Sequence, residues 1–489
     1  MQQTTADRKF SAGIRRTLPI LAALFLLASL GGCARKIAGN DRLGPPWNAN
    51  VVDKESAWSE ETLPVAPLPP EDKALSFDDC ILTAAHHAPD IAESLVGLEL
   101  TQMSSESAYY RRFPNIQTFF RVIANTTRQH KEYEDTSFRM GFGVYGFEPV
   151  ASSFSHRASL LMEDIALLTH KIALEKKAGQ IGEAMLSLQN REKLRELQKT
   201  RLEQAKQFSV YQKAKEGPAP NPMEQAKAAH FEQRIAAELE KTEASISSLL
   251  LALKVLTGLD LDRKLRIDPA SLNKMLDNDG ASAALAKSSW EAVWQPSPES
   301  RIIKLALKLR DYDVMVNWTR YLPTMNMDVY AANPTSDYAT YSTKDDIFLN
   351  ITFTLPLLDW GERERGVQGS RLRRLQESQR AKAARTGFAA GWQSAWNDFR
   401  MAAASFEAAR NKVAALALDE QKAELQYHGG QVDFSVVDNI RTRLYEEELA
   451  MAEAEMQLSL REFANWLLSG NFRRRYFENT EREEEKSAL

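Results

Sequence analysis

Three short motifs occur twice in this chain of 489 residues, in the same order and about 210 residues apart. The pairs are Arg112-Phe113-Pro114 with Tyr321-Leu322-Pro323, Phe147-Glu148-Pro149-Val150 with Leu355-Pro356-Leu357, and Leu256-Thr257-Gly258 with Leu468-Ser469-Gly470. Three landmarks at a nearly constant separation indicate an internal duplication. We therefore expect two tandem repeats, each made of a helix, a β-hairpin, a very long helix, a tight turn and a further helix.

Each repeat contains two segments in which apolar and polar residues alternate with a period of two. The clearest apolar series is Met325, Met327, Val329 and Ala331, then Ile347, Leu349, Ile351, Phe353 and Leu355. The pattern predicts strands over about 114–127, 138–149, 324–332 and 347–356. Such strands are typical of membrane β-barrels, with apolar side chains toward lipid and polar ones toward a wet lumen, although a soluble sandwich would also alternate.

Aromatic residues lie at the strand ends that face the helices, as an interfacial girdle requires. They are Tyr109, Tyr110 and Phe154 in the first repeat, and Trp318 and Trp360 in the second. Four strands cannot close a barrel, and an open edge in lipid leaves backbone groups without hydrogen bonds. We therefore expect other copies to complete it. Two copies would give eight strands and three would give twelve, and periodicity does not choose between them.

Two segments without proline, about 155–214 and 362–427, predict very long helices. At 1.5 Å per residue each reaches roughly 90 to 100 Å. The shorter helices expected end to end beside them cover about 77–112 with 224–256, and about 299–320 with 434–468. The alternative is an ordinary long coiled coil that acts as a spacer.

Composition removes several classes of protein. The net charge of −4 lacks the basic excess of a general nucleic-acid binder, and a mean hydropathy of −0.40 with 26% charged residues excludes a multi-span helical membrane protein. Residues Gly141–Gly146 spell a dinucleotide fingerprint, but no helix opens after them and Pro149 interrupts, so we expect glycines on a strand. We find no catalytic constellation and no metal-ligand spacing, so neither an enzyme nor a cofactor is expected.

The first 32 residues have the features of an export signal. A basic segment precedes an apolar run over residues 18–30 that is too short to span a bilayer. The run ends in Leu30-Gly31-Gly32-Cys33, which resembles the bacterial lipobox and implies a diacylglycerol and an N-acyl chain on Cys33; an ordinary signal peptide with a chance cysteine is the alternative. Ala34 then favours the outer membrane. Cys80 is left as a buried, unpaired thiol.

The expected organisation follows from these boundaries. An extended, proline-rich strap covers residues 33–74, the first repeat 75–260 and a linker 261–298. The second repeat covers 299–470, and a charged tail that we expect to be solvated ends the chain at 471–489.

The arrangement resembles the TolC family of outer-membrane efflux proteins over nearly all of the mature chain. The motifs that carry the likeness are Leu75-Ser76-Phe77-Asp78-Asp79, Tyr321-Leu322-Pro323-Thr324 and Leu355-Pro356-Leu357-Leu358-Asp359-Trp360-Gly361. The family implies a mainly α protein with a membrane β-barrel portion: a homotrimer whose twelve strands form a barrel, continued by a long α-helical periplasmic barrel. It also implies a passive duct, supplied by an inner-membrane transporter through a periplasmic adaptor protein.

The same resemblance places a gate at the two helix turns, residues 216–222, which include Gly217, and 429–433, which begin with Gly429 and Gly430. Asp438 matches a lumen-facing carboxylate of the family, and three copies would form an acidic ring. Ser435 occupies the position of a second such carboxylate, for which Asp433 is a possible substitute. Alternatively, Asp438 only stabilises the start of its helix.

Two other functions stay open from the sequence. One is the outer-membrane duct of a secretion or polymer-export system of the same family. The other is a structural lipoprotein whose helices form a coiled-coil scaffold.

Overall fold

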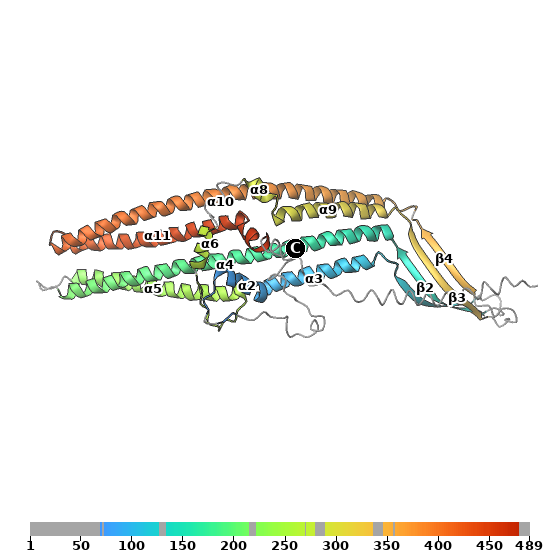
Figure 1. Ribbon diagram of the computed structural model, residues 1–489, viewed down its shortest axis with the longest axis horizontal. Coiled ribbons are helices and arrows are strands. Elements are labelled where there is room, and N and C mark those ends of the chain that lie inside the picture. The colour runs from blue at the N-terminus through green and yellow to red at the C-terminus, as the bar shows by residue number, and fades with distance from the viewer. Residues whose placement is uncertain are drawn as a thin grey trace, which may run out of the picture.

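The computed structural model describes residues 69–70, 73–126, 134–214, 222–268, 270–278, 289–335, 346–355 and 357–478. It is an elongated molecule, with long helices over most of its length and a four-stranded sheet at one end (Figure 1). Within these ranges no helix combines the length and the apolar character needed to cross a membrane. Cys33 and Gly217 lie outside the described residues.

Two helices, α4 (Pro149–Ala214) and α10 (Glu362–His428), run 66 and 67 residues without a break. The shorter helices α3 (Pro89–Tyr110) and α5 (Pro222–Thr257) lie along α4, and α9 (Pro298–Thr319) and α11 (Phe434–Leu468) lie along α10 (Figure 1). This confirms the predicted stacking of two shorter helices on each long one. The repeats meet where α4 contacts α9 and α11.

The first helix differs from the prediction, because it is interrupted. Helix α2 (Phe77–His87) ends before Ala88, whose backbone is extended, and α3 begins at Pro89. Proline has no N–H to donate and disfavours helical geometry in the residue before it, so the helix restarts there. Ser76 caps the start of α2: Ser76 Oγ accepts from the N–H of Asp79, whose carboxylate accepts from the N–H of Ser76.

The four strands form an antiparallel meander in the order β1 (Ile116–Thr126), β2 (Glu134–Phe147), β3 (Thr324–Thr335) and β4 (Asp346–Thr354). The register aligns residues of one kind across the sheet. One row is Thr118, Phe142, Val329 and Leu349, and its neighbour on the opposite face is Gln117, Gly143, Asp328 and Asn350. The sheet is therefore apolar on one face and polar on the other, as the period of two predicts.

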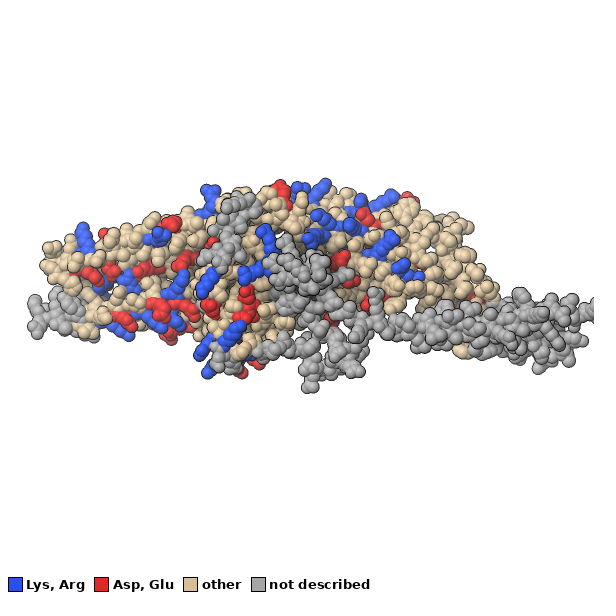
Figure 2. Space-filling model, viewed as in Figure 1, with Lys and Arg blue, Asp and Glu red and all other residues tan. Residues whose placement is uncertain are grey.

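The apolar face of this sheet is largely uncovered. Phe120 is 67% exposed, Leu349 62% and Phe353 65%. In Figure 2 the strand end carries almost none of the charged side chains that cover the helices. Within the described chain β1 and β4 are edge strands, each paired on one side only. The sheet is thus open and unpartnered on its apolar face.

Gly141 and Gly143 lie inside β2, which confirms that the glycine-rich motif is a strand and not a nucleotide-binding loop. A Cβ at Gly141 would approach the backbone of Val329 and Tyr330, and one at Gly143 would meet the ring of Tyr145. These glycines let aromatic side chains lie against the polar face of the strand.

The main hydrophobic core lies at the middle of the molecule, where α2, α4, α5, α11 and the C-terminal turns meet. Trp466 and Phe463 of α11 stack at 5.9 Å and are fully buried, and Phe77 of α2 packs edge-on to Phe463. Cys80 lies in the same core as a free thiol, as predicted, and burial raises its pKa to about 12.

The prediction of a solvated tail is wrong for its first eight residues. Residues 471–478 form α12 (Asn471–Arg473) and a π turn, η3 (Arg474–Glu478), and bury Phe472 and Phe477 in this core. Arg473 bonds Glu175 of α4 and Glu299 of α9 at 2.7 and 2.9 Å. The arginine run therefore fastens the chain end to both repeats.

The inter-repeat segment 261–298 also contains structure. It includes α6 (Ala270–Asn278) and α8 (Trp290–Trp294), and Ile267 forms a parallel bridge with Leu75. The segment thereby joins the start of the first repeat to the start of the second.

Candidate functional sites

The predicted interfacial aromatics lie where the helices meet the sheet. Tyr109 and Tyr110 end α3, Trp318 lies in the last turn of α9, and Trp360 lies between β4 and α10. All four are exposed, from 40% for Tyr109 to 84% for Trp360. Arg112 lies over the ring of Tyr109 and Arg371 over that of Trp318. Aromatic rings with one polar end, paired with cations where the helices meet the sheet, suit a boundary between apolar and aqueous surroundings.

Asp359 organises the turn that follows β4. Its carboxylate accepts from the backbone N–H groups of Gly361 and Arg363 and from the Arg363 side chain. The bonds to Arg363 hold the pKa of Asp359 below its ordinary value. Trp360 and Gly361 both take left-handed backbone conformations, with φ of 53° and 78°. The Leu-Asp-Trp-Gly sequence therefore makes a sharp turn from strand into helix and places Trp360 outward.

The helix turn between α10 and α11 lies at the opposite end of the molecule (Figure 1). Gly430, at φ 72°, ends α10, while Gln431 N–H donates to Gln426 O at 2.9 Å and Gly430 N–H to Tyr427 O at 3.0 Å. These bonds satisfy carbonyl groups that the helix end leaves free, and they require a residue that tolerates positive φ. The predicted turn at Gly429 and Gly430 is thus built by the glycines.

An aromatic cluster supports this turn from the first repeat. Phe208 of α4 stacks on Phe434 of α11 at 5.3 Å and approaches Tyr427 of α10 at 6.2 Å. The guanidinium of Arg441 lies 4.1 Å from the ring centre of Phe208. Phe434 and Tyr427 are buried. The turn therefore packs against α4, and the two helix pairs touch here through rings.

A charged network lies next to the cluster and spans three helices. Arg201 of α4 bonds both carboxylate oxygens of Glu448 on α11, at 2.5 and 2.9 Å, and Glu420 on α10 at 3.3 Å. Arg441 of α11 bonds Glu420 and Glu424 of α10. The side chains of Arg201 and Glu448 are only 17% and 11% exposed. Burial would lower the pKa of Arg201, but its bonds to Glu448 and Glu420 hold the pKa above its ordinary value.

A hydrogen bond and an ion pair next to this network join α5 to α11. The hydroxyl of Tyr445 donates to Glu238 at 2.6 Å, and Arg234 bonds Glu446 at 3.1 Å. To separate the first helix pair from the second at this end, all of these contacts must break.

Asp438 lies on α11 one turn beyond Phe434 and is half-buried. Burial raises the pKa of its carboxyl, against the opposing charges of Lys227, Arg441 and His230. Asp438 therefore faces the first turns of α5 within the chain. Asp433 and Ser435 are exposed beside it, and Asp433 occupies the N-cap of α11 without a side-chain bond to it. Their predicted role in a gate stays a prediction.

Sequence patterns alone do not single out Arg201, Glu420, Arg441 or Glu448. The local signal was present: Glu420 and Glu424 are four residues apart, and Arg441 and Glu448 are seven apart, near the ends of proline-free helices. Their partner Arg201 is 247 residues away from Glu448, and local spacing cannot supply that pairing. Across the described ranges, no group of three His, Cys, Asp or Glu side chains is placed to hold a metal ion.

Comparisons with known proteins identify the fold. No protein-family model matches the sequence, and neither does any curated protein sequence. Among solved structures, the chain is similar to the Campylobacter jejuni CmeC outer membrane channel, at 15% identity with a TM-score of 0.66, over 88% of this chain and 95% of that one.

The Neisseria gonorrhoeae MtrE outer membrane channel in its open state is similar at 15% identity and a TM-score of 0.63, over 81% of this chain and 88% of that one. The outer membrane protein VceC of Vibrio cholerae is similar at 14% identity and a TM-score of 0.61, over 81% and 95% of the two chains. The resemblance to TolC-like channels is thus confirmed at the level of the fold.

Proposed function

We propose that this chain is the outer-membrane channel of a tripartite efflux or export system. It forms a passive, gated duct that carries substrates from an inner-membrane pump and a periplasmic adaptor to the exterior. The observation that carries the proposal is the pairing of two features at opposite ends of one protomer. An open sheet has an exposed apolar face, and about 100 Å of helix ends in a turn held by buried ion pairs.

The open sheet supports closure by other copies. Its edge strands β1 and β4 present backbone N–H and C=O groups that need partners in lipid, and the alternation gives lipid an apolar face and the lumen a polar one. We propose a homotrimer, in which three sheets form a twelve-stranded barrel and the helices continue it as a periplasmic tunnel. The exposed aromatics Trp318, Trp360, Tyr109 and Tyr110 would then mark the periplasmic surface of the membrane.

The export signal and the lipid on Cys33 belong to the same proposal. Acyl chains at Cys33 would hold the start of the mature chain on the outer membrane, on which the barrel also depends. Lipid on Cys33 also agrees with a Cys80 thiol that is buried and free.

We place the gate at the helix-turn end. Opening requires α10 and α11 to move away from α4 and α5, so the bonds of Arg201 to Glu448 and Glu420 hold the duct closed. Three copies of Asp438 would repel one another and favour cations at the entrance. The same end is where an adaptor protein would bind and supply the free energy of opening.

Conductance in planar bilayers tests the duct and its gate. We expect the purified oligomer to insert and give small, discrete conductance steps. Arg201→Met leaves Glu448 without its cation and Glu420 with Arg441 alone, so it should open the duct and raise the single-channel conductance several-fold. Lys199→Met is the matched control, since Lys199 is exposed and, among the described residues, bonds only Glu196 on its own helix.

Absence of any conductance from an inserted oligomer, in wild type, Arg201→Met and Asp438→Ala alike, would contradict the duct and favour a coiled-coil scaffold. Equal conductance steps in wild type and Arg201→Met would instead place the gate elsewhere.

A further inference from the structure

Helices α3 and α10 are the two outer helices of the half of the molecule that adjoins the sheet. In this half α3 packs on α4, α4 on α9 and α9 on α10, an order that Figure 1 shows from bottom to top. The outer helices continue the edge strands, since β1 follows α3 and β4 precedes α10. Near the sheet, each therefore has one flank on which no described helix packs.

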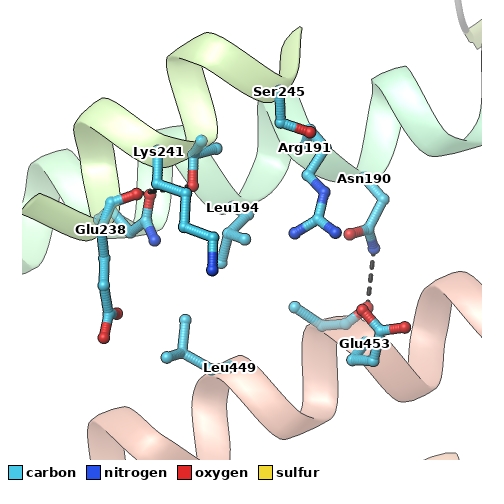
Figure 3. A pocket seen from close by; sticks show the side chains of 11 residues that line it. Asn190, Arg191, Leu194, Glu238, Lys241, Ser245, Leu449 and Glu453 are labelled. Atoms are coloured by element: carbon cyan, nitrogen blue, oxygen red, sulfur yellow. Dashed lines mark hydrogen bonds between the residues drawn. The ribbon is translucent and has the colours of Figure 1, made fainter. Parts of the chain in front are cut away.

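The seam between the two repeats, by contrast, is covered within one protomer. The amide of Asn190 on α4 donates to Ala452 O on α11 at 2.8 Å, and Leu194 points toward Leu449 across a pocket of about 350 Å³ (Figure 3). Cations and carboxylates both line this pocket, so its charge selects no ligand. The helix surface that lacks a partner lies instead at α3 and α10.

The free flanks of α3 and α10 carry exposed apolar side chains. On α3 these are Val96, Leu100 and Met103, which are 38%, 61% and 44% exposed and share one helix face. On α10 Leu372 and Leu375 are 66% and 56% exposed. Leu100 lies ten residues before the end of α3, roughly 15 Å from the aromatic boundary. A membrane that ends at this boundary does not reach these side chains, so their burial requires a protein partner.

The internal duplication sets the height at which the two flanks would meet. Helix α3 is the counterpart of α9, because the same motif follows both before a strand begins. Within one protomer the bond of Arg374 to Asp311 fixes the height of α10 against α9. Gln102 is the counterpart of Asp311 in α3. If α3 of another copy meets the other flank of α10 at this height, Leu100 lies level with Leu375.

The two helices also have opposite charge. Helix α3 contains four acidic residues and no Lys or Arg, whereas Lys and Arg outnumber Glu by eight to three over residues 362–385 of α10. Glu93 and Glu99 of α3 form no ion pair with a residue that the structure describes, and neither do Arg365 and Arg373 of α10. An acidic partner for α10 and a basic partner for α3 are both supplied by a second copy of this chain.

We propose that α3 of one copy docks on α10 of the next, with Leu100 and Met103 packed against Leu372 and Leu375. This docking rests on the proposed closure by other copies, and it names the helix pair that joins neighbours outside the membrane. Opposite charges attract the two helices over a distance of about 10 Å, and the apolar contact then holds them. The contact is head-to-tail, so repeating it closes a ring.

Oxidative cross-linking of the full-length protein in membranes tests this helix pair. Leu100→Cys is combined with Gln376→Cys, which is exposed on α10 one turn after Leu372. Helix axes about 8 to 10 Å apart bring facing Cα atoms within the reach of a disulfide, so we expect covalent species of two and three copies. Leu100→Cys with Thr386→Cys is the matched control, because Thr386 is also exposed but lies roughly 15 Å farther along α10. It should give no cross-link.

The sheet edges provide the comparison that separates this docking from closure of the barrel. If Gln117→Cys with Asn350→Cys links copies while Leu100→Cys with Gln376→Cys does not, the docking of α3 on α10 is overturned and the barrel stands. If neither pair links copies, closure by other copies is overturned as well. Equal cross-linking of the Thr386→Cys control would also overturn the docking.

A charge placed in the contact tests its apolar part. Leu100→Glu adds a carboxylate to an acidic helix and buries it against leucines, so association in detergent should weaken roughly ten-fold or more. Met315→Glu is the control, since Met315 is 44% exposed on α9, which is not an outer helix. Sedimentation velocity over a dilution series compares the two variants with wild type. Equal association of Leu100→Glu and Met315→Glu would contradict the docking.

Discussion

Gly258 and Gly470 end corresponding helices of the two repeats and differ in one respect. Both follow the last turn of a helix and take positive φ, 73° and 76°. A Cβ at Gly258 would approach the backbone of His87 to 2.2 Å, whereas a Cβ at Gly470 would meet open space. The repeated Leu-x-Gly motif therefore combines a conformational requirement in both repeats with a steric one in the first.

Alanine substitutions at Gly258 and Gly470 separate the conformational requirement from the steric one. Gly470→Ala should lower the free energy of unfolding by about 1 kcal/mol, the cost of a left-handed alanine. Gly258→Ala adds a backbone collision and should cost about 3 kcal/mol or more. Denaturant unfolding of both variants measures the difference. If both variants lose the same free energy of unfolding, the backbone near His87 moves aside without destabilising the fold.

His170 of α4 makes stability depend on pH. It is 2% exposed, lies 2.6 Å from Ser94 Oγ through Nδ1, and burial lowers its pKa to about 4. The unfolded chain takes up this proton near pH 6.5 and the folded chain only near 4, so stability falls as pH drops through that window. The loss is at most about 3 kcal/mol.

His170→Gln removes the titration while keeping a polar side chain. We expect the loss of stability between pH 7 and pH 4.5 to be smaller in this variant than in wild type, as measured by urea unfolding at both values. The same pH dependence in both proteins would mean that His170 becomes protonated without unfolding.

Residues of these kinds show what the sequence could predict. Gly430 and Gly470 were recognisable because a helix end needs positive φ, which is a local property. Arg473 was misread as solvated, because the neighbouring Arg474, Arg475 and Glu478 hide the apolar Phe472 and Phe477 in a charged run. The partners Glu175 and Glu299 lie far away in sequence, and only the fold brings them to Arg473.

At the scale of elements, the strands were predictable from periodicity and the long helices from the absence of proline. A period of two placed Leu349 and Asn350 on opposite faces of β4, and the register confirms it. The absence of proline gave the two long helices, and Pro89 explains the interruption between α2 and α3. Contacts between elements were not predictable, because Arg201, Glu420 and Glu448 meet only once three helices are packed.

The two faces of β4 can be tested with neighbouring residues. Leu349→Arg puts a charge on the face proposed to contact lipid and should cost roughly 2 to 4 kcal/mol at the membrane midplane. Asn350→Arg puts the same charge on the polar face and should be tolerated. The yield of folded protein in lipid vesicles compares them. If both variants fold equally well, the apolar face does not contact lipid.

At the scale of the whole molecule, one protomer leaves part of its sheet without partners. Its core is continuous at the middle, where α2, α4, α5, α11 and the C-terminal turns meet, but its sheet has two edges and an exposed apolar face. Charged side chains of both signs cover the helices in Figure 2 and are nearly absent over the strands. An aqueous helical body joined to an apolar sheet is the division expected of a channel that stands partly in a membrane.

Disulfide cross-linking between the two sheet edges tests most directly whether copies of this chain close the barrel. Gln117→Cys in β1 is combined with Asn350→Cys or Thr352→Cys in β4, all exposed on the polar face, and the single variants serve as controls. Neighbouring strands bring Cα atoms to about 5 Å, within the reach of a disulfide. We expect oxidation in the membrane to give covalent species of two and three copies and none larger. A ladder that ends at two copies, or no cross-link in either pair, would contradict the trimeric barrel.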